Sequence, residues 1–179
     1  MPHITTAVEY GMHCLLYLVE PGGKTPLASA RDLANLQGVP VEYVSKLFTK
    51  LQKAGLVVGS EGAGGGFRLA RHANSISVLD VIVAIDGEKA LFECREIRGR
   101  CAVFGGKPPS WATRGVCGIH VIMLEAESRM REVLASNTLG DIAASVAAKA
   151  PAQFSREIAK WLANRTPISR GAAKKSLRQ

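Results

Sequence analysis

The sequence predicts a mainly α-helical protein that contains one small β-hairpin. Three observations lead to this prediction. Apolar residues recur at helical spacing in three consecutive segments between residues 5 and 55. Two short β-like segments, 56–60 and 67–71, then flank the glycine-rich turn EGAGGG. A long amphipathic segment begins at about Gly118.

The first two helices are expected before residue 40. The first covers residues 5–20 and is expected to end at Pro21–Gly23. Its apolar positions recur at helical spacing: Val8, Met12, Leu15, Leu16 and Val19. A shorter helix is predicted from about Leu27 to Gln37, and Gly38 is its expected stop.

The third helix lies within residues 39–55, and Gly55 caps its C-terminus. Its predicted inward stripe contains Val41, Val44, Leu47, Phe48 and Leu51. Its outward positions are Glu42, Tyr43, Lys46, Thr49, Lys50 and Lys53. Three helices followed by a hairpin form a winged helix-turn-helix, in which the third helix enters a major groove and the hairpin is the wing.

Four further helices are predicted after the hairpin. They cover residues 77–87, about 118–136, 138–150 and 151–165. Thr138 is the expected N-cap of the third of these, because Asp141 follows three residues later as an approximate capping box.

The chain therefore divides into four predicted parts. Residues 1–87 form the winged helix-turn-helix, 88–117 a cysteine-bearing loop, 118–165 a dimerisation helix with the C-terminal helices, and 166–179 a basic flexible tail. If the long helix packed only on its own small domain, its apolar stripe would stay exposed. We therefore predict a homodimer, although packing within one chain is the alternative.

Composition suggests a polyanionic partner. The chain has 179 residues, 47% of them hydrophobic, and a net charge of +8. Such an excess of positive charge favours nucleic acid, and less so an acidic membrane surface. No apolar run approaches the roughly 20 residues of a membrane span, and the N-terminus lacks a positively charged start. We expect a cytoplasmic protein with no membrane association, in which thiols stay reduced.

Several residues are candidates for binding a double-stranded DNA operator. Lys46, Lys50 and Lys53 share one helix face, a pattern that a solvated surface would also show. Arg71 and Arg68 follow from the wing strand and could contact phosphates. Gly64, Gly65 and Gly66 are expected to need a positive φ or a close backbone approach to DNA. The predicted DNA-binding set is Tyr43, Lys46, Lys50, Lys53, Gly64, Gly65 and Arg68.

Three of the four cysteines fall in a stretch without apolar periodicity. Cys94, Cys101 and Cys117 are separated by six and fifteen residues, which is not the spacing of a zinc CxxC pair. Thiolates in an open loop suit an iron–sulfur cluster, and the nearby residues Arg95, Arg98 and Arg100 favour the thiolate form. The alternative is a redox disulfide, Cys94–Cys101 or Cys101–Cys117.

Two further features of the sequence could serve metal binding or catalysis. Glu9 and His13 stand four residues apart on the first helix, so they could share a metal or simply contact each other on the helix surface. His120 lies three residues after Cys117 and could serve a cysteine nucleophile as base. Nothing nearby orients this histidine, so we predict that the protein is not an enzyme.

The segments KLFTKLQKAGLV, GAGGGFRL and SVLDVIVAIDG, with the cysteines that follow them, resemble the Rrf-type transcriptional regulators. The resemblance covers about residues 4–140. It implies a dimeric winged-helix transcription factor, which in many members binds an iron–sulfur cluster through three loop cysteines. Cys94, Cys101 and Cys117 take those places. In the IscR branch a histidine follows the third cysteine as it does in CGIH, which makes His120 a candidate fourth ligand.

The first helix carries a second resemblance. Its segment VEYGMHC is similar to the RsrR branch of that family. In that branch a glutamate and a histidine of one subunit, with two cysteines of the other, hold a 2Fe–2S cluster. The resemblance implies a 2Fe–2S cofactor and a ligand set drawn from Glu9, His13, Cys94, Cys101 and Cys117. The long insert between Cys101 and Cys117 leaves open which cysteines bind it. The implied function is sensing of redox state, iron–sulfur status or nitric oxide.

Overall fold

A computed structural model describes residues 4–19, 27–62 and 64–164. Among these the chain forms two compact units, residues 88–134 and residues 4–87 together with 135–164. The predicted helix stop at Pro21–Gly23 and the predicted basic tail 166–179 lie outside the described residues.

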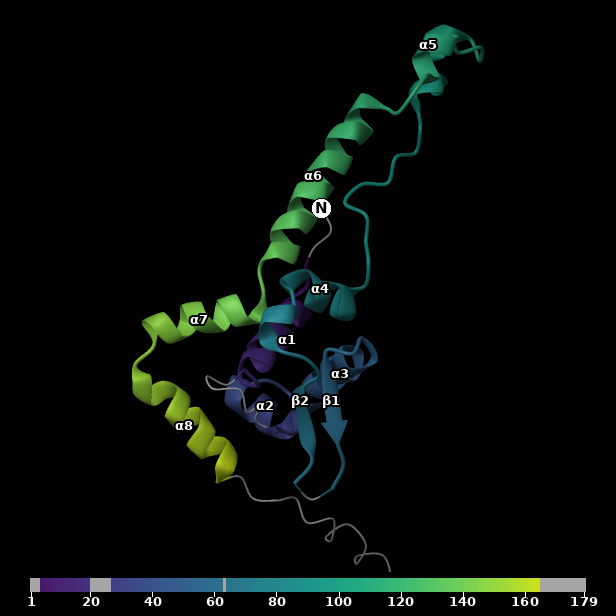
Figure 1. Ribbon diagram of the computed structural model, residues 1–179. Helices are drawn as coiled ribbons and strands as arrows, with labels where there is room; N and C mark the ends of the chain where they lie inside the picture. The colour runs from purple at the N-terminus through teal and green to yellow at the C-terminus, as the bar shows by residue number, and fades with distance from the viewer. Residues whose placement is uncertain (1–3, 20–26, 63, 165–179) are drawn as a thin grey trace, which may run out of the picture. The chain divides into compact units, whose positions relative to one another are not determined.

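Residues 4–87 form the predicted winged helix-turn-helix (Figure 1). Its elements are α1 (Thr6–Leu16), α2 (Ala30–Gln37), α3 (Val41–Lys53), β1 (Val57–Ser60), β2 (Gly66–Leu69) and α4 (Val78–Asp86). The two strands are antiparallel and pair Val57 with Leu69 and Ser60 with Gly66. The Phe67 backbone also exchanges two hydrogen bonds with Ala28, so β2 has a partner on each side. The predicted fold class, mainly α-helical with one hairpin, is confirmed.

Capping boxes fix the starts of three helices. In each, a side-chain oxygen accepts a hydrogen bond from the amide three residues on, and the aspartate there accepts one from the cap amide. The pairs are Ser29 with Asp32, Ser77 with Asp80, and Thr138 with Asp141. The last pair confirms the predicted start of α7 (Leu139–Lys149). Gly38, with φ 70°, ends α2 as predicted.

The first two helices are shorter than predicted. α1 ends at Leu16, because the amides of Leu18 and Val19 bond to carbonyls three residues back instead of four. α2 begins at Ala30 and not near Leu27. Ser29 is its N-cap, and the Ala28 backbone is already committed to the β-bridge with Phe67.

One hydrophobic core joins these elements. The predicted stripe of α3 supplies four buried side chains: Val44, Leu47, Phe48 and Leu51. Full burial of a side chain as large as Phe48 or Leu51 stabilises the fold by roughly 1.5–3 kcal/mol. α7 and α8 (Ala152–Ala163) extend this core, to which they contribute buried Leu139 and Leu162.

The C-terminal turn of α4 contacts both α1 and α3. Gly11 of α1 packs so close to Ile85 that a Cβ at position 11 would collide with that side chain. Lys50 of α3 donates a hydrogen bond from Nζ to the Ile85 carbonyl at 2.5 Å. Thr5, just before α1, donates from its amide and hydroxyl to the Asp86 carboxylate at 2.9 and 2.7 Å.

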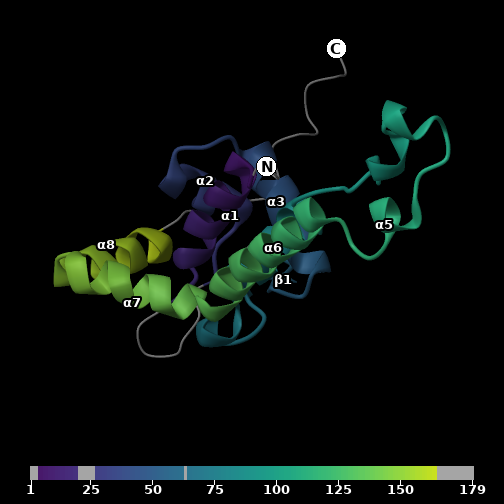
Figure 2. The ribbon, with the colours of Figure 1, turned by 90° about the horizontal axis from the view of Figure 1, so that it is seen from above.

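The unit of residues 88–134 contains most of a long helix and an extended segment that runs along it (Figures 1 and 2). α6 covers Gly118–Ser136, and not one of its residues is buried. The extended segment is held by a Glu88–Arg131 ion pair at 3.2 Å and by a hydrogen bond from the Leu91 amide to Glu127 at 3.1 Å. Within the described ranges, no helix is both long and apolar enough to cross a membrane.

The remainder of this unit is a loop of short turns. It contains η2 (Arg98–Arg100), η3 (Ala102–Phe104) and α5 (Ser110–Thr113). The ring of Trp111 makes an edge contact with Phe104 at 5.9 Å between centroids. Figures 1 and 2 show α5 beyond the N-terminal end of α6. The segment predicted as an open loop therefore contains local structure.

None of Gly64, Gly65 and Gly66 has the positive φ that is one of the two alternatives expected for them, whereas the other, a close backbone approach to DNA, stays a prediction. Among the described residues of the turn, Gly62 has a positive φ, of 116°. Gly65 instead lies against the Ser60 carbonyl, and a Cβ at Gly66 would lie 2.5 Å from the carbonyl carbon of Ala28. Close approach of protein backbone therefore accounts for Gly65 and Gly66, whereas a Cβ at Gly64 would meet open space.

We predict that Gly65→Ala opens the wing while Gly64→Ala does not. The new methyl group collides with the Ser60 carbonyl in the first variant only, a strain of about 1–3 kcal/mol. Hydrogen exchange of the amides in residues 57–60 and 66–69 should be faster in Gly65→Ala than in wild type. Equal exchange in the two variants would contradict the packing explanation.

Candidate nucleic-acid interface and metal-binding loop

The outward face of α3 is positively charged. Lys46, Lys50 and Lys53 are all exposed, and their spacing of four and three residues places them along one side of the helix. The buried stripe of the same helix fixes which side that is. Arg68, on β2 opposite Val58, is also exposed and adds a charge on the wing.

Two of the cations predicted for DNA have protein partners. Lys50 donates to the Ile85 carbonyl at the end of α4, where a positive charge is favourable because the helix dipole is negative there. Arg71 lies beyond β2 and forms an ion pair with Asp80 at 2.9 Å. Lys46, Lys53 and Arg68 are therefore the clearer candidates for phosphate contacts.

Tyr43 is half-buried on α3. Its ring meets Tyr10 of α1 edge-on, with centroids 5.6 Å apart and an angle of 82° between the planes. Tyr10 stands between the possible metal ligands of α1, since Glu9 precedes it and His13 follows. The side chains of Glu9 and His13 are both exposed.

The four cysteines fall into two classes. Cys14 is completely buried in α1, and burial raises the pKa of its thiol from 9.0 to about 12, so it is an inert part of the core. Cys94 and Cys117 are half-buried, and Cys101 is exposed. All four are free thiols. The three loop cysteines belong to the unit 88–134, whereas Glu9 and His13 belong to the other unit.

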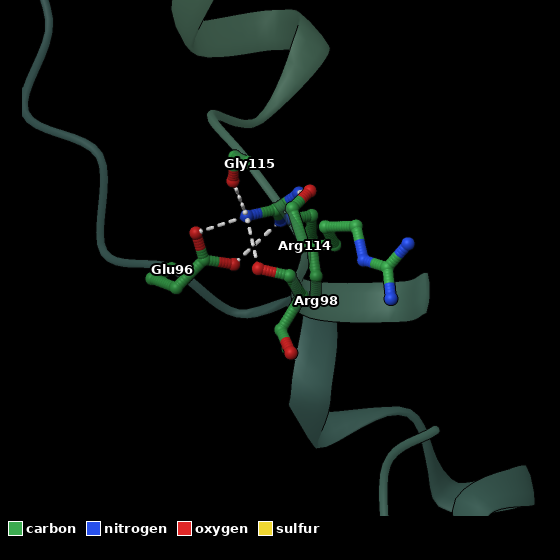
Figure 3. Close-up of polar contacts among 5 residues, drawn as sticks. Glu96, Arg98, Arg114 and Gly115 are labelled. Atoms are coloured by element: carbon green, nitrogen blue, oxygen red, sulfur yellow. Dashed lines mark hydrogen bonds and ion pairs between the residues drawn. The ribbon is translucent and has the colours of Figure 1, made fainter. Parts of the chain in front are cut away.

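Arg98 connects the two ends of the cysteine loop (Figure 3). Its Nε and Nη2 atoms each donate to one carboxylate oxygen of Glu96 at 2.6 Å. Nη2 also donates to the Gly115 carbonyl at 2.8 Å and to the Thr113 carbonyl at 3.4 Å. The residues next to Cys94 are thereby tied to the residues that precede Cys117.

Electrostatic effects on the pKa values of Glu96 and Arg98 show which other charged groups lie near them. The hydrogen bond from Arg98 lowers the pKa of the Glu96 carboxyl, and the charge of His120 adds a smaller effect in the same direction. The pKa of Arg98 is raised, first by its hydrogen bond to Glu96 and further by negative charge on Cys117 and Cys94. His120 also packs on Phe92, with 6.0 Å between ring centroids.

Sequence reasoning missed this arrangement. Arg98 was singled out only as one of three arginines near the thiols. A glutamate two residues before an arginine does not indicate hydrogen bonds to carbonyls fifteen to seventeen residues away. Neither does it signal that Glu96 adopts φ 44°, a backbone angle uncommon for residues other than glycine.

The donor chemistry of the loop fits an iron–sulfur cluster. Thiolate sulfur is the preferred ligand of such clusters, and imidazole or carboxylate can complete the set. Cys94, Cys101 and Cys117 are free and at least partly accessible, and the positive charge of Arg98 lies near Cys94 and Cys117. In the described part of the chain, no three histidine, cysteine, aspartate or glutamate side chains are grouped closely enough to hold one metal ion.

Comparison with known proteins gives the family. Residues 4–145 match the Rrf2 family, described as "Iron-dependent Transcriptional regulator". Protein rrf2 of Nitratidesulfovibrio vulgaris is 34% identical over 139 residues, 78% of this chain and 85% of that protein. The HTH-type transcriptional regulator IscR of Vibrio vulnificus is 34% identical over 78% of this chain and 76% of its own length.

Solved structures agree with these sequence matches. CymR, the global cysteine regulator of B. subtilis, has a TM-score of 0.63 and 25% identity over 81% of this chain and 98% of that chain. T. potens IscR has a TM-score of 0.61 and 26% identity over 87% of this chain and 96% of that chain. The predictions of a winged helix and of a regulator in place of an enzyme are confirmed. This chain belongs to the Rrf2 family of transcriptional regulators.

Proposed function

We propose that the protein is a homodimeric, cytoplasmic regulator that binds a near-palindromic DNA operator and senses redox state, iron–sulfur status or nitric oxide through an iron–sulfur cluster. The observation that carries the proposal is a loop with three free thiols that follows a winged helix-turn-helix in the sequence. The description of the Rrf2 family as iron-dependent supports iron as the metal.

DNA binding is attributed to α3 and the wing. The exposed lysines of α3 lie on the face opposite to its buried stripe, where they are available to phosphates. Arg68 would add a contact from β2. Tyr43 and the turn glycines Gly64 and Gly65 are proposed to lie at the same interface.

Dimerisation is attributed to α6. Ile119, Ile122 and Val133 are between 61% and 67% exposed, and their spacing puts them on one side of the helix. Water contact with such a stripe is unfavourable, so a second copy of the same helix is its proposed cover. A dimer also presents two α3 helices, as a near-palindromic operator requires.

The cluster is expected to be 2Fe–2S. Cys117, with Cys94 or Cys101, is proposed to bind it together with Glu9 and His13 of the partner subunit. Exposure of both side chains on α1 supports this assignment, since each can reach a second chain. When bound, a cluster supplies one-electron redox chemistry, and a carboxylate ligand is more easily displaced than a thiolate.

Two alternatives stay open. His120 is a local candidate ligand, because its ring packs on Phe92 within the same unit as the loop cysteines and its charge acts on Glu96. A metal-free regulator could instead switch by a disulfide between loop thiols, which the exposure of Cys101 favours. The disulfide alternative predicts colourless protein, since a disulfide does not absorb visible light and an iron–sulfur cluster does.

We expect Lys46→Gln to weaken binding to operator and unrelated duplexes alike. Loss of one phosphate contact should also flatten the slope of log affinity against log salt by about one unit. Lys149→Gln is the matched control, because Lys149 is an exposed lysine at the end of α7. Affinity and salt slope can be measured by fluorescence anisotropy. Equal behaviour of the two variants would remove α3 from the interface.

Anaerobic visible spectra with iron and sulfide assays should identify the ligands. We predict that wild-type protein contains iron and sulfide, that Cys117→Ala loses the cluster, and that His13→Ala has an altered spectrum. His120→Ala is the control and should keep the wild-type spectrum. The reverse result for the two histidines would show that ligation is local to the loop, and colourless, iron-free wild type would favour the disulfide switch.

A further inference from the structure

We propose that Arg98 is a positioning residue whose contacts with Glu96 and with the carbonyls of residues 113–115 fix the separation of Cys94 and Cys117. The inference rests on the proposed function only in taking an iron–sulfur cluster as what these thiols hold. We call these contacts the clasp.

The clasp sits at equal chain distance from the two thiols. Glu96 comes two residues after Cys94, and Gly115 two residues before Cys117. Three hydrogen bonds of 2.6–2.8 Å join Glu96 and Gly115 through one guanidinium group (Figure 3). Neither thiol can therefore move far from the other while the clasp is closed.

The clasp also explains how the loop accommodates its long insert. Between the joined ends, the chain makes two 3₁₀ turns and the short helix α5, and η2 packs against α5. Cys101 belongs to this projecting part and is exposed. The fifteen residues between Cys101 and Cys117 consequently do not set the separation of Cys94 from Cys117.

Local geometry indicates that the contacts are specific to arginine. The fork of the guanidinium reaches both oxygens of Glu96 and, through Nη2, two carbonyls on the other segment. A lysine has the same charge but a single point donor group without that planar fork. The left-handed φ of Glu96 is a strained backbone angle that such contacts can hold in place.

A contribution to the stability of the whole protein does not explain the Glu96–Arg98 ion pair. The Glu96 side chain is 48% exposed, and exposed ion pairs contribute little to the free energy of unfolding. Removal of Arg98 should therefore leave the thermal midpoint of the protein nearly unchanged. A local effect on the thiols can then be separated from loss of fold.

The first test uses iron-free protein in a Cys101→Ser background, which leaves Cys94 and Cys117 as the loop thiols. Diamide oxidises these two thiols to one disulfide. The thiols lose two electrons and two protons, and diamide takes up the same two electrons and two protons to become a hydrazine. We expect Arg98→Lys and Arg98→Gln to slow formation of the Cys94–Cys117 disulfide by about tenfold, because the separation of the two thiols is no longer limited by the clasp. Peptide mass spectrometry gives the yield.

Arg100→Lys and Arg100→Gln are the matched controls. Arg100 is exposed in the same 3₁₀ turn, and its side chain makes no hydrogen bond or ion pair with the described residues, so both variants should oxidise at the wild-type rate. If Arg98→Lys oxidises as wild type does while Arg98→Gln is slow, the role of Arg98 is charge alone and the clasp is wrong. Wild-type rates in both Arg98 variants would equally overturn it.

The second test uses reconstituted protein. We expect Arg98→Lys to change the visible circular dichroism of the cluster and to lose iron to a chelator about tenfold faster than Arg100→Lys. An unchanged signature and rate in Arg98→Lys would overturn the clasp. If no variant and no wild type takes up iron, the proposed function has failed, and the disulfide assay on iron-free protein still decides the clasp.

Discussion

The last turn of α4 constrains the helices that carry the two proposed activities. Gly11 allows α1 to pack against Ile85, and the carbonyl of the same Ile85 accepts a hydrogen bond from Lys50 of α3. Thr5 ties the start of α1 to Asp86. Because all these contacts meet at Ile85 and Asp86, a shift of α1 against α4 would also disturb α3. A ligand held by Glu9 and His13 would thus act on the proposed DNA-binding face of α3 through packed contacts.

The cysteine loop is built on a different principle. It has few buried side chains, and its order comes from polar contacts of Arg98 and from the segment that α6 holds through Glu88 and Leu91. Outside the Arg98 contacts, such a loop can adjust around a bound group at low energetic cost, whereas a packed core cannot. The inert Cys14 in α1 shows the contrast, because a thiol placed in the core is withdrawn from chemistry.

The helices and the hairpin could be predicted from periodicity, since the spacing of apolar residues fixes which face each helix buries. The start of α2 was misplaced because Ala28 is held by a bridge to Phe67, a contact distant in sequence. The turn glycines were assigned to DNA or to positive φ, yet Gly65 and Gly66 are needed because protein backbone passes close to them. The candidate ligands were recognisable by residue type, but the partners of Lys50, Arg71 and Arg98 depend on tertiary contacts that no local pattern encodes.

In the proposed regulator, chemistry at the cysteine loop alters DNA binding. The most direct measurement is an anaerobic operator titration of wild-type protein with its cluster intact, first oxidised and then reduced. The predicted result is a change in affinity of about tenfold or more, which corresponds to a coupling of roughly 1.4 kcal/mol. Equal affinity in both redox states, with a change only after the cluster is lost, would contradict redox coupling and indicate a sensor of cluster supply or damage.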